Sequence, residues 1–340
     1  MEIIKKGAPV LLAGAMFFGV SSCNGNSAGE ISKDSASVTT NEKATSKAGQ
    51  PIDTADYDKR MLALSNGDTT GKWPTKPIYP LPGAILPYNR IVAFYGNLYS
   101  KKMGILGEIP KKEMLKKLQG EVANWQKADS SMPVIPALHY VAVTAQSNGG
   151  KQRMRMPNHQ IDSIISWANE INALVFLDIQ VGWSTLQEEV PALEKYLSMP
   201  NVHLGIDPEF SMKFGDVPGK RIGTFNADDV NYSINYLAGL VKKNNLPPKM
   251  LVVHRFTQGM VTNAMNIKPT PEVQVIMDMD GWGDKILKKS TWLRYIKKEP
   301  VQFTGFKLFY KNDTKKDANG LYTPQELLQF TPKPNYIQYQ

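Results

Sequence analysis

Short runs of apolar, β-branched or aromatic residues alternate along the chain with longer segments whose apolar positions recur at helical spacing. Runs of the first kind predict strands, and segments of the second kind predict amphipathic helices. The predicted strands span residues 90–97, 134–144, 173–181, 202–210, 250–256, 273–280 and 303–310. The predicted helices span residues 111–127, 158–171, 185–197, 227–243 and 285–298. From residue 88 onward, the chain therefore alternates strand and helix.

This alternation favours a (β/α)₈ TIM barrel over residues 88–340. Seven predicted strands, five of them followed by a predicted helix, precede a terminal segment, Tyr336-Ile-Gln-Tyr-Gln, that would close the ring. Such barrels typically need about 250 residues. The competing architecture is a doubly wound open sheet, which normally carries a Gly-rich first turn that holds a phosphate. Here the first strand runs into Tyr95-Gly-Asn-Leu-Tyr instead, so we expect the barrel.

The start of the chain has the features of a bacterial lipoprotein signal over residues 1–22. Lys5 and Lys6 precede an apolar run at residues 7–20, which is shorter than the roughly 20 residues that span a bilayer. The small pair Ser21-Ser22 then precedes Cys23, the only cysteine of the chain. The thiol of Cys23 is therefore predicted to carry the lipid anchor, and no internal disulfide is expected.

Two further segments separate this anchor from the predicted barrel. Residues 23–56 are rich in small and polar side chains, which predicts a flexible linker because so little apolar surface is available for burial. Residues 57–87 gain aromatic residues and prolines, which predicts an extended arm packed on the barrel. We expect the protein in the bacterial cell envelope, and Asn24, where some bacteria use Asp for inner-membrane retention, favours the outer membrane.

The net charge of +9 draws an exported protein toward anionic polymers or lipid headgroups. The lysines are, however, scattered through the predicted helices, which indicates solvent-exposed helix faces. No nucleic-acid-binding motif is present, so no nucleic-acid partner is expected.

Carboxylates gather where the predicted strands end, which is the strongest functional signal in the sequence. Strand side chains alternate between faces, and the chemistry of a TIM barrel lies at the C-terminal ends of its strands. If these side chains point inward, five carboxylates meet above one barrel mouth: Asp178, Asp207, Glu209, Asp278 and Asp280. Fold stability alone does not call for such a cluster.

Crowded carboxylates raise the pKa of at least one of them, so that a proton stays available near neutral pH. Glycosidic bond cleavage needs such a proton donor beside an ionised carboxylate. Glu209 is the predicted acid, because it lies furthest along its strand and has the longer side chain. Asp207 would tune it, and Asp178 or Asp280 would act as base or charge stabiliser. This reaction calls for no metal ion or other cofactor.

Other polar and aromatic residues near strand ends are predicted to bind substrate. Flat aromatic faces stack on sugar rings, and amide, imidazole, carboxylate and ammonium groups orient hydroxyls or anions. The predicted substrate-binding residues are Tyr95, Gln180, Trp183, His254, Asp278, Trp282 and Lys307. Several have competing structural interpretations: the two tryptophans could pack under loops, and His254, on an apolar strand, could be an oriented core histidine.

Five strings of the chain resemble those of an uncharacterised bacterial family of secreted proteins and lipoproteins described as glycoside-hydrolase-like. They are Ala93-Phe-Tyr-Gly-Asn, Leu177-Asp-Ile-Gln-Val-Gly, Leu204-Gly-Ile-Asp-Pro-Glu, Leu251-Val-Val-His-Arg-Phe and Met277-Asp-Met-Asp-Gly-Trp-Gly. The resemblance covers about residues 88–340. It supports the TIM barrel.

More distantly, Asp207-Pro-Glu209 is similar to part of the Asp-x-Asp-x-Glu string of chitinase-like hydrolases and to the Asp-x-Glu of phage-type lysozymes. Gly205 stands where a chitinase would have its first Asp, and Met279 stands where the Met-x-Tyr-Asp string would have Tyr. Substrate-assisted cleavage of N-acetyl sugars is therefore not expected.

Two alternatives remain open from the sequence. One is a metal-dependent phosphoester hydrolase, because the carboxylates and His254 include enough ligands for divalent ions and Lys307 could contact a phosphate. The other is a glycan-binding envelope lipoprotein that has lost catalysis. The prediction favoured here is a membrane-anchored barrel that hydrolyses a polysaccharide or cell-envelope glycan.

Overall fold

The computed structural model of the protein describes residues 51–340. The predicted signal peptide, Cys23 and most of the predicted linker lie outside the described residues. Within the described part of the chain, no helix combines the length and the apolar character needed to cross a membrane.

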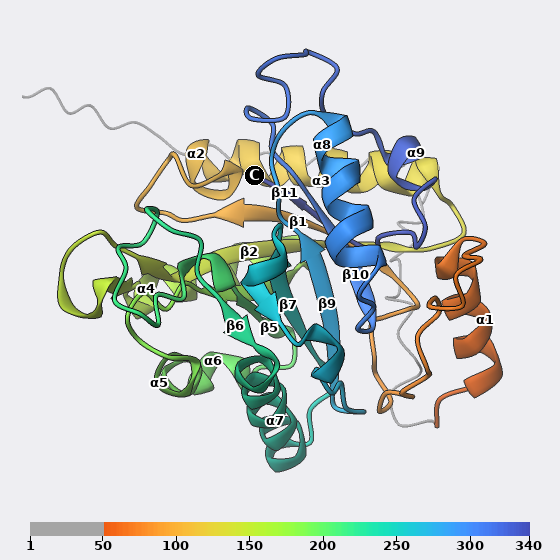
Figure 1. Ribbon diagram of the computed structural model, residues 1–340, viewed down its shortest axis with the longest axis horizontal. Coiled ribbons are helices and arrows are strands. Elements are labelled where there is room, and N and C mark those ends of the chain that lie inside the picture. Colours follow the sequence, from red (N-terminus) through yellow and green to blue (C-terminus); the bar gives the residue numbers. More distant parts are fainter. Residues whose placement is uncertain (1–50) are drawn as a thin grey trace, which may run out of the picture. The chain divides into compact units, whose positions relative to one another are not determined.

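Eight parallel strands form a closed barrel, as the sequence predicts (Figure 1). In order around the ring they are β1 (Arg90–Gly96), β2 (Val134–Ala145), β4 (Leu174–Ile179), β5 (Val202–Ile206), β7 (Lys249–Arg255), β9 (Val273–Met279), β10 (Phe303–Leu308) and β11 (Tyr336–Tyr339). The terminal strand β11 pairs with β10 on one side and with β1 on the other. β1 in turn pairs with β2, and this contact closes the ring.

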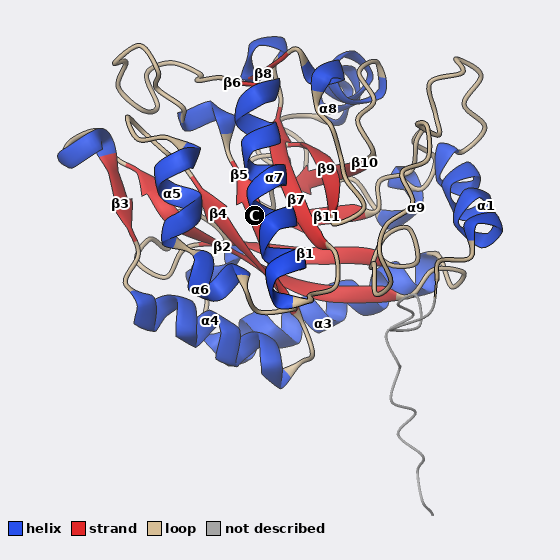
Figure 2. Cartoon of the chain, turned by 90° about the horizontal axis from the view of Figure 1, so that it is seen from below, coloured by secondary structure: helices blue, strands red, loops and turns tan. Residues whose placement is uncertain are grey.

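Helices lie outside the ring of strands (Figure 2). They are α2 (Ile105–Glu108), α3 (Lys111–Ala128), α4 (Asn158–Glu170), α5 (Leu186–Ala192), α6 (Glu194–Leu197), α7 (Ala227–Asn244), α8 (Lys285–Thr291) and α9 (Pro324–Leu327). The single helix predicted over 185–197 is two helices, because Pro191 interrupts the hydrogen-bond ladder and the backbone leaves helical geometry at Leu193. The helix predicted over 285–298 continues beyond α8 as a π-helix, Trp292–Lys297.

Three short strands were not predicted. β3 (Arg153–Arg155) runs antiparallel to the end of β2, and β6 (Phe225–Asn226) pairs with β8 (Val261–Thr262) in a small separate sheet. Each has only two or three residues, too few to show an alternating pattern. Both pairings lie in connections beyond the barrel strands.

Alternation along the strands divides the buried side chains into two groups. Those facing outward, such as Val92, Leu138 and Val253, pack with the surrounding helices in the larger core cluster. Those facing inward near the strand starts, such as Ile91 and Ile276, form a second apolar cluster. Closer to the strand ends, the inward positions carry polar and charged groups, which places the chemistry at the C-terminal end of the barrel.

The prediction of an extended arm over residues 57–87 is wrong for its first part, which is helical. The helix α1 (Thr54–Ser65) also includes the last residues of the predicted linker. The Asp53 side chain accepts hydrogen bonds from the backbone N–H groups of Ala55 and Asp56 and so caps its N-terminus. Tyr57, Met61 and Leu64, spaced as one face of a helix, pack into the inner apolar cluster. α1 therefore seals the N-terminal end of the barrel interior, away from the C-terminal ends of the strands.

Candidate active site

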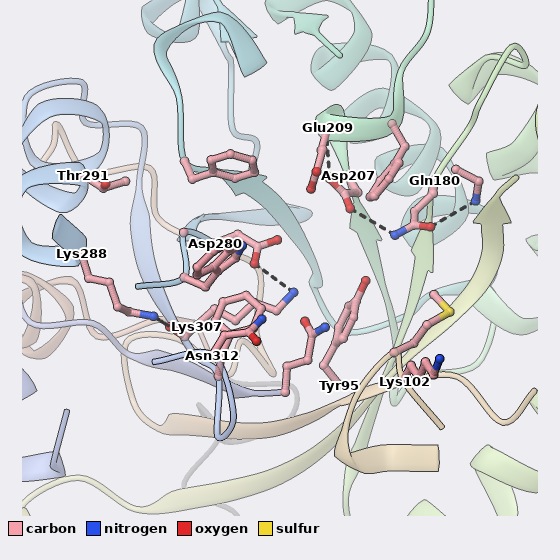
Figure 3. A pocket seen from close by; sticks show the side chains of 18 of the residues that line it. Tyr95, Lys102, Gln180, Asp207, Glu209, Asp280, Lys288, Thr291, Lys307 and Asn312 are labelled. Carbon is pink, nitrogen blue, oxygen red and sulfur yellow. Dashed lines mark hydrogen bonds and ion pairs between the residues drawn. The ribbon is translucent and has the colours of Figure 1, made fainter. Parts of the chain in front are cut away.

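A cavity of about 670 Å³ opens at the C-terminal end of the barrel (Figure 3). Every barrel strand contributes to its lining, either from its last residues or from those directly after it. In strand order these residues are Tyr95, Ala145, Gln180, Asp207, Phe256, Asp280, Lys307 and Gln340. Such convergence is the usual design of a TIM-barrel active site.

The structure brings most of the predicted site residues together at this cavity. Those that line it are Tyr95, Gln180, Asp207, Glu209, Asp280, Trp282 and Lys307. Asp178, His254 and Asp278 are fully buried and are not among the lining residues. These side chains therefore face the barrel interior as the alternation predicts, but they form two layers: residues that line the cavity, and fully buried residues beneath them.

Asp207 and Glu209 come from the end of β5, in a geometry that differs from the prediction. The strand ends at Ile206 rather than at residue 210, and Pro208–Phe210 forms a short 3₁₀ helix. The Asp207 carboxylate accepts a hydrogen bond from the Glu209 backbone N–H at 3.0 Å and another from the Gln180 side chain at 3.3 Å. Asp207 thus both begins a turn and faces the cavity.

Both of these carboxyl groups hold their protons unusually tightly. Burial, with added repulsion from Asp280, raises the pKa of Glu209 to about 7, although the charges of Lys307 and His254 oppose the shift. Burial also raises the pKa of Asp207 well above its usual range. A protonated carboxyl group is therefore available at the cavity near neutral pH.

Asp280 lines the same cavity but is ionised, in contrast to the protonated Glu209. The Lys307 ammonium lies 2.9 Å from its Oδ1 atom, and His254 Nδ1 lies 3.1 Å from its Oδ2 atom. Burial alone would raise the pKa of Asp280, but these two neighbours outweigh it and hold the pKa below its usual range. Lys307 is also fixed against the face of Tyr95, with 3.7 Å between the ammonium and the ring centroid. The cavity thus holds a protonated and an ionised carboxyl group together.

Beneath the cavity, His254 lies among three buried carboxylates. Its Nε2 atom is 3.3 Å from Asp178 Oδ2, and its Nδ1 atom is 3.4 Å from Asp278 Oδ2, in addition to the contact with Asp280. Burial would lower the pKa of His254, but Asp178 and Asp280 raise it well above its usual value. The structural interpretation of His254 as an oriented buried histidine fits this placement better than direct substrate contact.

His139, on β2, is a member of the buried cluster that the sequence analysis did not single out. Its Nε2 atom lies 3.5 Å from Asp178 Oδ2, and its Nδ1 atom is hydrogen-bonded to the Tyr336 hydroxyl at 2.6 Å. Burial lowers the pKa of His139 to about 4, so the ring is neutral near pH 7. The signal for it was its register, because His139 pairs with Tyr95 on β1, whose side chain also faces inward.

Two glycines on inward strand positions make room for this cluster. A methyl group at Gly205 would lie 2.6 Å from both Asp178 Oδ1 and His139 Nε2. A methyl group at Gly305 would lie 2.5 Å from Asp278 Oδ1. Neither position could therefore carry a side chain while the buried carboxylates and histidine keep their places.

The two predicted stacking tryptophans differ in position. Trp282 lines the cavity, as do Phe210 and Phe256, and its side chain is 59% exposed. Trp183 is 45% exposed, but its indole N–H donates to the Asp216 carbonyl at 2.8 Å and the residue is not part of the cavity lining. Of the two tryptophans, Trp282 therefore faces the cavity and Trp183 does not.

Comparisons with known proteins leave the identity of the chain open. No family model matches it, and no curated protein matches it. Among solved structures, it is similar to dihydropteroate synthase of Burkholderia cenocepacia, solved with 7,8-dihydropteroate, at 8% identity and a TM-score of 0.35 over 75% of this chain and 86% of that chain. It is also similar to the spore cortex-lytic enzyme SleL of Bacillus megaterium QM B1551, at 12% identity and a TM-score of 0.34 over 85% of this chain and 69% of that chain. At these scores neither likeness bears on function, which has to be argued from the cavity.

Proposed function

We propose that this barrel hydrolyses glycosidic bonds in a polysaccharide or cell-envelope glycan by carboxylate acid–base catalysis. The observation that carries the proposal is the pairing of Glu209, whose pKa burial raises to about 7, with the ionised Asp280 on one cavity. A proton donor and a carboxylate anion flanking the scissile bond are the two requirements of this reaction.

The roles follow from accessibility and charge. Protonated Glu209 gives its proton to the leaving oxygen as the glycosidic C–O bond breaks, and the oxocarbenium-like centre faces the charge of Asp280. Water then adds to the anomeric carbon and its proton passes to a carboxylate of the cavity. Asp178 was an equal candidate for the base, but its complete burial favours Asp280. Asp207 orients Glu209 through its backbone N–H.

The shape of the cavity also suits a sugar. Its volume of about 670 Å³ lies in the range of small-molecule sites, and it combines aromatic faces with a few fixed polar groups. Trp282 provides an exposed ring for stacking, while Gln180, Lys102 and Asn312 offer hydrogen-bonding groups for hydroxyls. We further propose that lipid on Cys23 holds the barrel at the bacterial outer membrane, where envelope or environmental glycans are within reach.

The test is reducing-end release from a panel of polysaccharides that includes peptidoglycan and chitin, with the full-length chain purified in mild detergent. Glu209→Gln keeps the size of the side chain but cannot donate the proton, so we expect its rate to fall by a factor of about 10² to 10⁴. The exposed Glu113→Gln, on α3, is the matched control and should keep the wild-type rate.

Other outcomes would redirect the proposal. Release that is unchanged in Glu209→Gln would remove Glu209 from the acid role. Saturable glycan binding without any product would favour the non-catalytic glycan-binding lipoprotein. Cleavage of a phosphoester such as p-nitrophenyl phosphate, in place of glycans, would favour the metal-dependent hydrolase.

A further inference from the structure

The buried cluster below the cavity has an arrangement that acid–base catalysis does not explain. His139 from β2, Asp178 from β4 and His254 from β7 each present one ligand atom, and the three atoms lie within 4.8 Å of one another. All three side chains are fully buried. Structural histidines in a barrel core do not need to converge on one carboxylate oxygen.

The polar atoms that face each other here have no hydrogen-bond partners. His139 Nε2, His254 Nε2 and Asp178 Oδ2 are all unsatisfied, although each is buried. Leaving a buried polar atom unsatisfied is unfavourable, so three at one point require an explanation. A positive ion between them would satisfy all three at once.

The distances fit a metal ion better than direct hydrogen bonds. Asp178 Oδ2 lies 3.5 Å from His139 Nε2 and 3.3 Å from His254 Nε2. Hydrogen bonds from N–H to oxygen are usually about 2.7–3.2 Å. A tetrahedral ion at about 2.0–2.1 Å from each ligand would separate neighbouring ligands by roughly 3.3–3.4 Å, close to the observed spacing.

The outer nitrogen of each histidine faces a group that can orient the ring, as is usual for metal-binding histidines. His139 Nδ1 is hydrogen-bonded to the Tyr336 hydroxyl, which also accepts a hydrogen bond from the Gln338 side chain. His254 Nδ1 lies 3.1 Å from a carboxylate oxygen of Asp280. With Nδ1 engaged outward, Nε2 of each ring is turned toward Asp178, as in carboxylate–histidine–metal arrangements.

The charge balance and the space around the cluster also favour a bound metal ion. Asp178, Asp278 and Asp280 are buried together, and Lys307 forms an ion pair with Asp280. Buried carboxylates in excess of their cationic partners are stabilised when they surround a metal ion. Gly205 leaves the space beside His139 Nε2 and Asp178 free of any side chain.

We propose that His139, Asp178 and His254 bind a single ion of zinc or a related transition metal beneath the cavity. Two imidazoles and one carboxylate suit zinc or a related transition metal, whereas Mg²⁺ and Ca²⁺ prefer oxygen ligands throughout. The ion would join β2, β4 and β7 from inside the barrel. The inference does not depend on the proposed glycosidase activity, because none of the three ligands lines the cavity.

The experiment measures metal content and affinity in the full-length chain purified in mild detergent. The protein is stripped with a chelator, reloaded with ZnCl₂ and dialysed, and bound zinc is counted by elemental analysis. We expect about one ion per chain and, with Co²⁺ in place of zinc, the strong visible absorption of a four-coordinate site. Reloading should also raise the melting temperature, because the ion binds the folded state.

Variants separate a specific site from general binding. His139→Ala should reduce zinc affinity at least tenfold, whereas His159→Ala, an exposed histidine on α4, should leave it unchanged. Gly205→Ala keeps all three ligands but fills the space beside them, so it should also lose the ion. Tyr336→Phe, which removes the hydroxyl behind His139 and conserves the ring, should weaken binding without preventing folding.

Two results would overturn the proposal. The first is folded wild-type protein that retains no stoichiometric zinc after reloading and gives no Co²⁺ spectrum. The second is an equal loss of zinc in His159→Ala and His139→Ala. Because these readouts are metal content and spectroscopy, failure of the glycan assay does not affect them.

Discussion

The two ends of the barrel interior are built from the same strands and have opposite chemistry. Toward the strand starts, most inward positions are apolar and pack with one face of α1. Toward the strand ends, the inward positions carry buried carboxylates, histidines and a lysine. Phe176 and Asp178 show the change on β4, as do Ile276 and Asp278 on β9. A step of two residues, about 6.6 Å along a strand, separates the two regions.

The difference shows how the molecule supports a costly polar cluster. Burying charged groups is unfavourable unless they are paired, and the upper region still contains buried polar atoms without hydrogen bonds. The lower region offsets this cost, because it removes large apolar side chains from water. We therefore expect substitutions in the lower region to reduce stability, and substitutions at the cavity to change activity.

The largest expected effect on stability comes from Tyr57, the fully buried residue of α1 that packs into the lower cluster. Tyr57→Ala should lower the free energy of unfolding by about 3–5 kcal/mol, as for other large aromatic truncations in a core. The measurement is urea unfolding of the purified chain. Below the unfolding transition, kcat should stay at the wild-type value because α1 lies at the opposite end from the cavity.

Tyr57→Phe is the matched control. The hydroxyl donates to the Ile78 carbonyl at a long distance of 3.5 Å, so its removal should cost about 1 kcal/mol or less. Equal destabilisation by both variants would show that the hydroxyl, and not the packing of the ring, holds α1 in place.

An intermediate effect is expected from pH on the cavity residues. Glu209 must be protonated to act as an acid, and its pKa is raised to about 7 by burial and Asp280, while Lys307 and His254 oppose the shift. The protonated fraction is therefore high below pH 7 and falls about tenfold per pH unit above it. The rate kcat/KM should decline in the same way on the alkaline side.

The matching measurement is the pH profile of Glu209→Gln. The amide cannot titrate, so any residual activity of this variant should lack the alkaline decline near pH 7. A decline that persists in the variant would assign the titration to another group that faces Glu209, such as Asp207, whose pKa is also raised.

The fold could be predicted from the sequence because each barrel strand carries a strong local signal. Runs such as Leu251-Val-Val are β-branched and apolar, and the terminal Tyr336-Ile-Gln-Tyr segment correctly supplied the last strand. α1 was missed because the prolines after residue 73 dominated the composition of its segment, although Asp53 and the spacing of Tyr57 and Met61 both indicate a helix.

The candidate site could be predicted only in part, since local alternation gives the face of a side chain but not its depth or its neighbours. The inward direction of Asp178 and Asp278 was predictable, whereas their burial beneath the cavity depends on the closed ring. His139 stands alone on an apolar strand in the sequence. It joins Asp178 only because β2 and β4 are neighbours in the barrel.

The smallest expected effect distinguishes Trp183 from Trp282. The sequence predicts the same role for both, which is stacking on a sugar ring. Trp282→Ala should raise KM about 3- to 10-fold and change kcat little, because stacking on an exposed ring contributes about 0.5–1.5 kcal/mol. Trp183→Ala should leave KM unchanged, because Trp183 does not line the cavity. KM values for the best substrate of the panel measure both. A larger effect from Trp183 than from Trp282 would mean that the glycan runs across the outer loops near Asp216, where the Trp183 indole is anchored, and not through the cavity.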